Sequence, residues 1–194
     1  MQTIRPVMVS LFFCLICFGV VGQESGDYLN KHGKIFGIGD TLPDLEFYTP
    51  NSEPKSLKLS DFHNKKLIII DYWASWCTTC VNRFPRLDSL QTKFDYLLQI
   101  LLANDTVRSR DTEAKAVRAL KKQSIKLGKK IDLPILFGDL HSLELFPFFR
   151  SIPHYIWIDG NRKIVAITSS KEVNEENLLE YLNNQELNLP VKTH

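Results

Sequence analysis

The hydrophobic pattern of the chain is dominated by one apolar stretch, residues 67–73, which reads LIIIDYW. A run of seven residues, of which all but Asp71 are aliphatic or aromatic, has the length expected for a strand that is buried on both faces of a sheet. Beyond this run, apolar residues recur at helical spacing, at Leu87, Leu90, Phe94 and Leu97. This spacing predicts an amphipathic helix directly after the strand.

Later apolar runs continue the alternation of strands and helices. Residues 97–103 predict a second buried strand, so that strand, helix and strand form a right-handed parallel crossover. Residues 109–127 predict a helix with Ala114, Val117 and Leu120 on one face. Seven Lys or Arg residues lie between positions 115 and 130. We interpret them as a solvated helix face, with docking to an acidic partner or to anionic lipid headgroups as the alternative.

Four more apolar runs follow, at residues 133–137, 141–149, 154–158 and 163–168. The first two predict a short apolar segment and a short inserted helix. The last two flank Asp159 and Gly160, and an Asp-Gly pair between apolar runs is a strong hairpin signal. Asn174 is predicted to cap a final helix.

The composition is that of an ordinary globular protein with a single domain. The 194 residues are 44% hydrophobic and 24% charged, which leaves room for one substantial core. The formal net charge of +2 gives no reason to expect nucleic acid as a partner. Residues 23–36 are polar and lack apolar periodicity, so they predict a flexible leader before a domain at residues 37–190.

The N-terminus has the pattern of a secretory signal. Arg5 precedes an apolar run at residues 7–21, and we expect cleavage after Gly22, giving a signal peptide at residues 1–22. An uncleaved membrane anchor is the alternative, but about 15 apolar residues are fewer than the roughly 20 needed to span a bilayer. A lipid-modified Cys14 or Cys17 is disfavoured because bulky residues precede both.

The cysteine count then points to redox chemistry. If Cys14 and Cys17 are removed with the signal peptide, the mature chain keeps only Cys77 and Cys80. At a strand-to-helix junction, unpaired N–H groups and the positive helix end stabilise a thiolate. Zinc would require a second pair of ligands, and haem attachment requires His at position 81, where Val81 stands. A cycling CxxC pair is the remaining interpretation.

The sequence WASWCTTC, residues 73–80, resembles the active site of the thioredoxin superfamily, and in particular its thiol-disulfide oxidoreductases of the TlpA/ResA type. Residues 37–50, followed by LKLSDF, resemble the N-terminal hairpin of this type, with Pro43 and Asp44 before the first strand. The resemblance implies an α/β thioredoxin-like fold, with a central mixed β-sheet flanked by helices, an N-terminal β-hairpin and an inserted helical segment.

The resemblance also implies roles for individual residues. Cys77 would be the nucleophile and Cys80 the resolving cysteine, with Asp71 as a buried acid that assists proton transfer; the alternative for Asp71 is a solvated carboxylate at a strand end. Three residues match further landmarks of the site, namely the flanking aromatics Trp73 and Trp76 and the helix-kinking Pro85. Thr78 and Thr79 stand where thioredoxin has Gly-Pro, which leaves the direction of electron flow open.

The sequence SIPHYIWIDGNRKIV, residues 151–165, resembles the thioredoxin segment whose proline is cis and faces the cysteines. We therefore predict a cis bond before Pro153, with an ordinary trans proline as the alternative. Ile152 and Pro153 would contact the mixed-disulfide substrate. His154 would either face the site and lower the thiolate pKa or point away from it.

These expectations combine into a functional hypothesis. The resemblance implies a thiol-disulfide oxidoreductase of the cell envelope or periplasm that acts as a reductant and contributes to redox homeostasis. Its partners would be protein disulfides, with apocytochrome c as one candidate, and a membrane electron donor. We expect a monomer without cofactor or metal. The alternatives are a peroxiredoxin-like peroxidase and a non-enzymatic thioredoxin-fold module that binds a partner or carries a metal.

Overall fold

The computed structural model of the chain describes residues 35–104, 106–137, 146, 151–184 and 186–192. The predicted signal at residues 1–22, most of the predicted leader and most of the predicted helix at residues 141–149 lie outside this part of the chain. Among the residues that are described, no helix is both long enough and apolar enough to cross a membrane.

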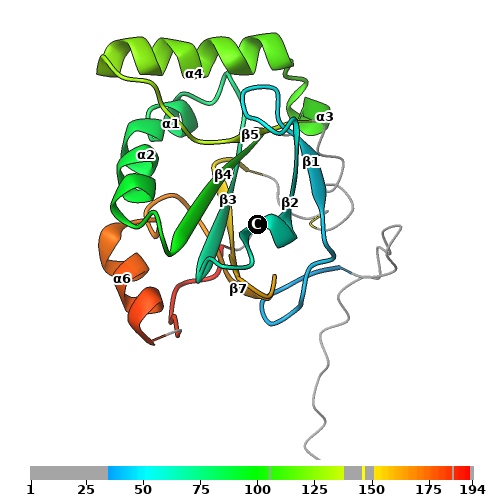
Figure 1. Cartoon of the computed structure of the whole chain (residues 1–194), viewed down its shortest axis with the longest axis vertical. Helices are drawn as coiled ribbons and strands as arrows, with labels where there is room; N and C mark the ends of the chain where they lie inside the picture. Colours follow the sequence, from blue (N-terminus) through cyan, green and yellow to red (C-terminus); the bar gives the residue numbers. More distant parts are fainter. Residues whose placement is uncertain (1–34, 105, 138–145, 147–150, 185, 193–194) are drawn as a thin grey trace, which may run out of the picture.

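A five-stranded mixed sheet forms the centre of the fold (Figure 1). Its order is β5-β4-β3-β6-β7, with parallel pairing from β3 to β5 and antiparallel pairing of β6 with both β3 and β7. The strands are β3 (Leu67–Trp73), β4 (Leu98–Asn104), β5 (Ile135–Leu136), β6 (His154–Asp159) and β7 (Ile164–Thr168). All seven residues of β3 are buried, as the apolar run predicts for a central strand.

The helices α1, α2, α4 and α6 cover one face of the sheet and the N-terminal hairpin covers the other (Figure 1). The helices are α1 (Thr78–Val81), α2 (Phe84–Lys93), α3 (Thr106–Ser109), α4 (Glu113–Leu127) and α6 (Glu175–Asn184). The hairpin pairs β1 (Glu46–Tyr48) with β2 (Ser56–Lys58), and the 3-10 helix η1 (Leu59–Phe62) follows it. The predicted thioredoxin-like architecture, including the hairpin, is confirmed.

Alternate residues of β3 face the two cores. The odd-numbered positions from Leu67 to Trp73 lie on the side of α1, α2, α4 and α6, and the even-numbered positions from Ile68 to Tyr72 lie on the side of the hairpin. This alternation follows from the pleat of the strand. It places Asp71 on the helix side, which is also the side of both cysteines.

The helix after the cysteines is interrupted just before Pro85, the residue at which the resemblance implies a kink. Helix α1 ends at Val81, and α2 begins at Phe84 with Pro85 in its first turn. Proline is accepted in a first turn because its missing N–H would have no partner there. Helix α2 also ends at Lys93, so that Phe94 and Leu97, predicted as helical, lie in the connection to β4.

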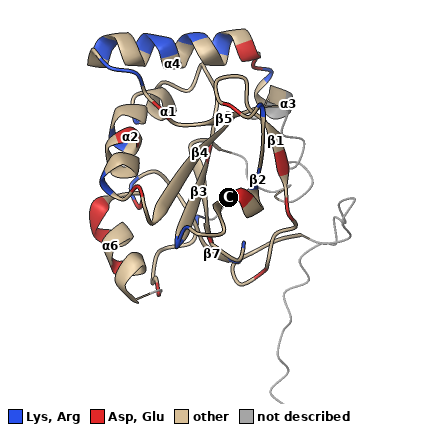
Figure 2. Ribbon diagram, viewed as in Figure 1, with Lys and Arg blue, Asp and Glu red and all other residues tan. Residues whose placement is uncertain are grey.

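The basic helix differs from its prediction in two respects. Residues 109–127 do not form one helix, because α3 ends at Ser109 and Thr112 caps α4, its hydroxyl accepting a hydrogen bond from the Lys115 N–H at 3.3 Å. The predicted face is also wrong for Ala114 and Val117, which are exposed. The buried positions of α4 are Ala116, Leu120 and Gln123. Lys and Arg positions, blue on the ribbon, recur along α4 from Lys115 to Lys126 (Figure 2).

The predicted hairpin between β6 and β7 exists, but its glycine serves another purpose than an Asp-Gly turn suggests. The left-handed residue of the turn is Arg162, with φ of 67°, and not Gly160. A Cβ atom added at Gly160 would lie 2.5 Å from the carbonyl oxygen of Lys65 and 2.9 Å from that of His63. Glycine is therefore required here by the close approach of the chain before β3.

A Gly160→Ala variant is expected to be less stable by about 1–3 kcal/mol, because the new methyl group must displace backbone atoms. Urea denaturation measures the loss. Gly37→Ala is the matched control, since nothing lies within 4 Å of a Cβ atom at that position. Equal stability of the two variants would contradict this explanation.

Candidate active site

The two cysteines lie where β3 ends and α1 begins. Cys77 is the N-cap residue of α1, and Cys80 lies in its only turn. They are joined by a disulfide with a Cα–Cα separation of 5.3 Å. Cys77 is 8% exposed and Cys80 is fully buried. The Cys80 N–H also donates a hydrogen bond to Cys77 Sγ at 3.2 Å, so a donor already faces the more accessible sulfur.

Asp71 is the buried carboxyl beneath this turn. It lies two residues before the end of β3, directly opposite Tyr155 of β6, and is completely buried. Neither carboxyl oxygen has a hydrogen bond of normal geometry in the described part of the chain. Burial raises the pKa of Asp71 well above its usual value, while the Tyr155 hydroxyl and the positive charges of Arg83 and Lys192 act in the opposite direction. The solvated alternative for Asp71 is wrong.

The Ile152–Pro153 peptide bond is cis, as predicted. The bond comes immediately before β6, whose first residue pairs with Tyr72 near the end of β3. This register places the proline loop at the edge of the sheet where β3 leads to the cysteines. Ile152 is partly buried and packs against both cores.

The two aromatic residues of the motif differ in exposure. Trp73 is fully buried and packs edge-on against Phe84, with 4.8 Å between the ring centroids. Trp76 is 61% exposed, and its indole N–H donates a hydrogen bond to the Ser109 carbonyl at 3.1 Å. Thr78 and Thr79, between the cysteines, are both exposed. Trp76 therefore offers an apolar surface next to the more accessible cysteine.

His154 does not face the cysteines. Its side chain is buried, and its ring lies 6.4 Å from that of Tyr72, on the hairpin side of the sheet. Tyr155, the next residue of β6, takes the cysteine side. Of the two orientations predicted for His154, the structure has the one that points away from the site.

Asp111 is a residue that the sequence did not single out, yet it holds the loop before Cys77. Its carboxylate accepts hydrogen bonds from the N–H of Ser75 at 2.5 Å and from the hydroxyl of Ser75 at 2.6 Å. It accepts two more, each of 2.9 Å, from the Asn104 amide and the Thr112 N–H. Burial alone would raise the pKa of Asp111, but these hydrogen bonds outweigh it and lower the pKa.

Replacing Asp111 by Ala is expected to lower the free energy of unfolding at neutral pH by about 1–3 kcal/mol, because the Ser75 donors lose their charged acceptor. Urea denaturation measures the change. Asp132→Ala is the control, since that side chain is 82% exposed and forms an ion pair with Lys130. Because the pKa of Asp111 is lowered by folding, its contribution is present above pH 3.8, the usual value, and is lost as the pH falls through the folded-state value. Wild-type stability that does not change as Asp111 titrates would contradict this role.

Lys192 is a second residue without a sequence signal. It lies in the polar tail after α6, and its ammonium donates hydrogen bonds to the carbonyl oxygens of Ser151 at 2.7 Å and Pro153 at 2.8 Å. Arg83, between α1 and α2, donates to the Val173 carbonyl at 3.0 Å. The positive charges of both side chains act on the buried Asp71 carboxyl.

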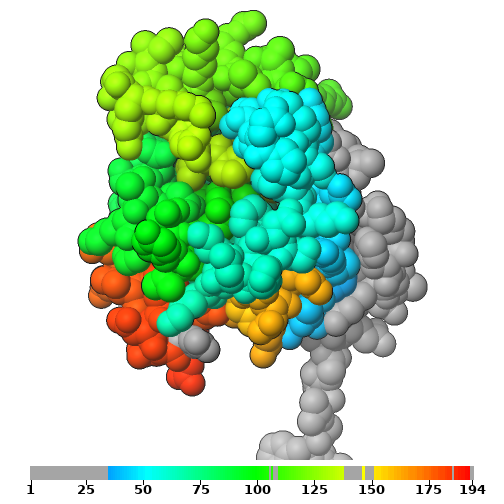
Figure 3. Space-filling view, viewed as in Figure 1, coloured from blue at the N-terminus to red at the C-terminus, as the bar shows by residue number. Residues whose placement is uncertain are grey.

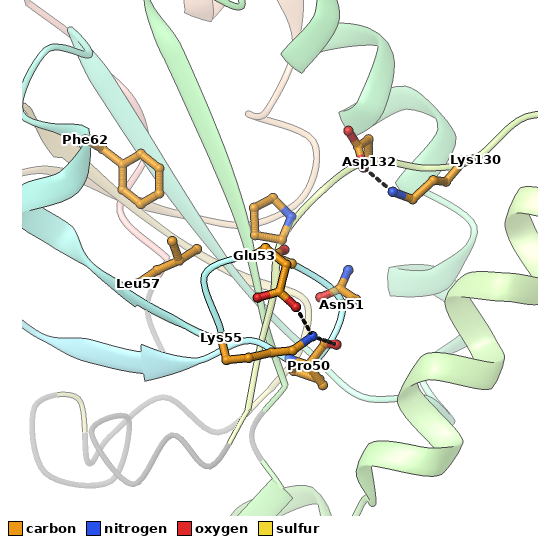
Figure 4. A pocket seen from close by; sticks show the side chains of 10 residues that line it. Pro50, Asn51, Glu53, Lys55, Leu57, Phe62, Lys130 and Asp132 are labelled. Carbon is orange, nitrogen blue, oxygen red and sulfur yellow. Dashed lines mark hydrogen bonds and ion pairs between the residues drawn. The ribbon is translucent and has the colours of Figure 1, made fainter.

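One hollow of the described surface is not part of this site. It has a volume of about 550 Å³ and lies between the hairpin and the segment after α4 (Figures 3 and 4). Its charged side chains pair with one another, Lys55 with Glu53 at 2.7 Å and Lys130 with Asp132 at 2.8 Å. No residue between Asp71 and Cys80 lines it. Nor do the described residues contain a group of three or more His, Cys, Asp or Glu side chains arranged to hold a metal ion.

A CxxC disulfide at the end of a central strand, a buried carboxyl below it and a cis-proline beside it define a protein of the thioredoxin-fold class. The chain belongs to the Redoxin family, whose sequence model matches residues 38–182. Among solved structures, it is similar to the thioredoxin domain of a thiol-disulfide oxidoreductase from Bacteroides vulgatus, with a TM-score of 0.60 and 19% identity. That match covers 76% of this chain and 99% of the other.

Two curated proteins show similarity in sequence. The thiol-disulfide oxidoreductase ResA of Oceanobacillus iheyensis is 24% identical over 92 residues, which is 46% of this chain and 45% of that protein. The thioredoxin-like protein YneN of Bacillus subtilis is 32% identical over 81 residues, which is 42% of this chain and 45% of that protein. The matches thus span less than half of each relative. The predicted resemblance to the ResA type is confirmed.

Proposed function

We propose that the protein is a thiol-disulfide oxidoreductase of the cell envelope that exchanges disulfides with partner proteins and acts as a reductant. The observation that carries this proposal is the Cys77–Cys80 disulfide, in which Cys77 keeps 8% of its surface exposed and Cys80 is fully buried. Unequal exposure suits two successive exchanges, because the substrate reaches one sulfur and the second stays behind it. The name of the relative ResA, a thiol-disulfide oxidoreductase, supports the same activity.

The first step joins the two proteins. In the reduced enzyme, the Cys77 thiolate attacks one sulfur of a substrate disulfide, and the other substrate sulfur leaves as a thiolate that takes up a proton. The thiolate is favoured by the position of Cys77 at the start of α1 and by the Cys80 N–H that faces its sulfur. The product is a mixed disulfide between Cys77 and the substrate.

The second step releases the reduced substrate. The Asp71 carboxylate accepts the proton of the Cys80 thiol, and the Cys80 thiolate attacks Cys77 Sγ. The enzyme disulfide forms, and the second substrate sulfur leaves as a thiolate that is protonated. Two electrons have then passed from the cysteine pair to the substrate. The raised pKa of Asp71 suits this role, because a weak acid gives a base strong enough to take a thiol proton.

Three residues are proposed to bind the substrate chain. Trp76 supplies exposed apolar surface beside Cys77, and Ile152 and Pro153 supply the loop beside the disulfide. An extended substrate segment that carries the target cysteine would lie along this loop and pair with its backbone. Recognition through backbone groups tolerates many sequences, which suits an enzyme with several protein substrates.

The proposed location follows from the N-terminal sequence. A signal peptide at residues 1–22 and a leader at residues 23–36 would deliver a domain at residues 37–190 to the envelope or periplasm. There a membrane electron donor would reduce the Cys77–Cys80 pair, and misoxidised secreted proteins or apocytochrome c would be substrates. We propose that the protein acts as a monomer without a cofactor.

An insulin assay tests the activity. In the presence of dithiothreitol, catalytic amounts of the protein are expected to speed the reduction of insulin disulfides, seen as earlier precipitation of the B chain. A peroxide-consumption assay on the same sample tests the peroxidase alternative. Peroxide turnover without insulin reduction would replace the proposed function by that of a peroxidase. The absence of both activities would favour a binding module.

A further inference from the structure

The polar tail after α6 returns to the active-site loop. It is held by hydrogen bonds from both the backbone and the side chain of Lys192. The backbone N–H of Lys192 donates to the Ile167 carbonyl of β7 at 2.9 Å, which docks the tail beside the sheet. Its ammonium then donates to the carbonyl oxygens of Ser151 and Pro153, at 2.7 and 2.8 Å. The two acceptors lie on either side of Ile152, so one cation holds both ends of the substrate-binding loop.

The same ammonium lies in the electrostatic surroundings of Asp71. Burial lowers the pKa of Lys192, and the negative charge of Asp71 acts in the opposite direction. Three groups act on the Asp71 carboxyl, namely Tyr155 from β6, Arg83 from the turn between α1 and α2, and Lys192 from the tail. Arg83 is already bonded to the Val173 carbonyl, which fixes its guanidinium. Lys192 is bonded to the proline loop, and its charge also acts on the Asp71 carboxyl.

We propose that Lys192 is a positioning residue for thiol-disulfide exchange, whose ammonium fixes the cis-proline loop for the substrate and places a positive charge near Asp71. This inference rests on the proposed function. It assigns two separable tasks to one side chain, because hydrogen bonding to the loop requires a donor, whereas the effect on Asp71 requires a charge.

Three substitutions separate the tasks. Lys192→Arg keeps donor and charge, Lys192→Gln keeps a donor without the charge, and Lys192→Met keeps neither. Lys171→Met is the matched control, since its side chain is 81% exposed and contacts only Glu172 among the charged groups of the described chain. Each full-length variant is assayed by stopped flow for two rates, formation of the mixed disulfide with a protein substrate and its resolution by Cys80, over a range of pH.

Loss of the charge is expected to raise the pKa of Asp71 further, so that its carboxylate forms at higher pH. The pH profile of the resolving step should therefore shift to higher pH in both Lys192→Gln and Lys192→Met. Formation of the mixed disulfide should slow about 10-fold in Lys192→Met, the scale of one charge-assisted hydrogen bond. That rate should change less in Lys192→Gln, and both readouts should stay at wild-type values in Lys192→Arg and Lys171→Met.

A resolving step with the wild-type pH profile in both Lys192→Gln and Lys192→Met would overturn the inference, even if urea denaturation showed reduced stability. If Lys192→Met does not fold, the profile of Lys192→Gln alone decides the question of charge. Failure of the wild-type protein to form a mixed disulfide at all would instead contradict the proposed function, so the two failures are distinguishable.

Discussion

A Cys77→Ser variant is expected to lose disulfide exchange, with a rate more than about 1,000-fold lower than that of the wild type. A Cys80→Ser variant is expected to form the mixed disulfide but not to resolve it. A serine hydroxyl is not ionised at neutral pH and forms no disulfide, so the first step has no nucleophile. In Cys80→Ser the accessible cysteine still attacks, but nothing resolves the product. The mixed disulfide with the substrate should then accumulate.

Mass spectrometry of the non-reduced complex checks both results. The Cys80→Ser protein should gain the mass of one substrate chain, and peptide mapping should place the bond at Cys77. The double variant lacking both cysteines is the control and should form no adduct. Accumulation of a substrate adduct at Cys80 in the Cys77→Ser protein would reverse the roles assigned from exposure.

An Asp71→Asn variant is expected to be more stable than the wild type at neutral pH, by at least about 1 kcal/mol. The pKa of Asp71 is raised well above 3.8 by burial. The folded state therefore holds its proton more tightly than the unfolded state does, and this favours folding only while the group is protonated. The contribution is complete below pH 3.8 and is lost as the pH rises through the folded-state pKa.

The wild-type protein should thus lose stability relative to Asp71→Asn as the pH rises from 4. Urea denaturation at several pH values measures this difference. Asp132→Asn is the matched control, because its side chain is 82% exposed and its neutralisation should have little effect. A constant difference between Asp71→Asn and wild type across the pH range would contradict the raised pKa.

The same Asp71→Asn substitution is expected to slow the reaction. An amide accepts no proton from Cys80, so resolution of the mixed disulfide should fall by about 100-fold, within the range for loss of a general base. Formation of the mixed disulfide at Cys77 should change little by comparison. Single-turnover stopped flow separates the two steps. If Asp71→Asn is more stable than the wild type but resolves the mixed disulfide more slowly, Asp71 is kept for function and not for stability.

Local patterns predict those parts of the fold in which neighbours along the chain determine the structure. The run at residues 67–73 identifies the central strand because every residue in it except Asp71 is apolar. In the structure all seven positions are buried. The CxxC pair and the segment around Pro153 are identified by short sequences that resemble a known site. The parallel pairing of β3 with β4 agrees with the predicted crossover between residues 67–73 and 97–103.

Residues whose partners are distant in sequence escape such patterns. Asp111 bonds to Ser75, 36 positions earlier, and Lys192 bonds to carbonyl groups 39 and 41 positions earlier. An isolated Asp or Lys in a polar segment is ordinarily solvated, so nothing local distinguishes these two. The predicted buried face of α4 is wrong for a related reason, because Gln123 is buried and donates a hydrogen bond to Asn82 Oδ1 at 3.4 Å, whereas Val117 is exposed.

The central claim, that Cys77 and Cys80 form a cycling pair, is tested most directly by a redox titration. The protein is equilibrated in dithiothreitol or glutathione buffers of graded potential, the free thiols are alkylated, and the oxidised fraction is determined by mass. We predict one two-electron transition near the thioredoxin value, about −270 mV, as befits a reductant. A transition near −120 mV would instead indicate a disulfide donor. A pair that stays in one state across the whole range would contradict the proposed exchange reaction itself.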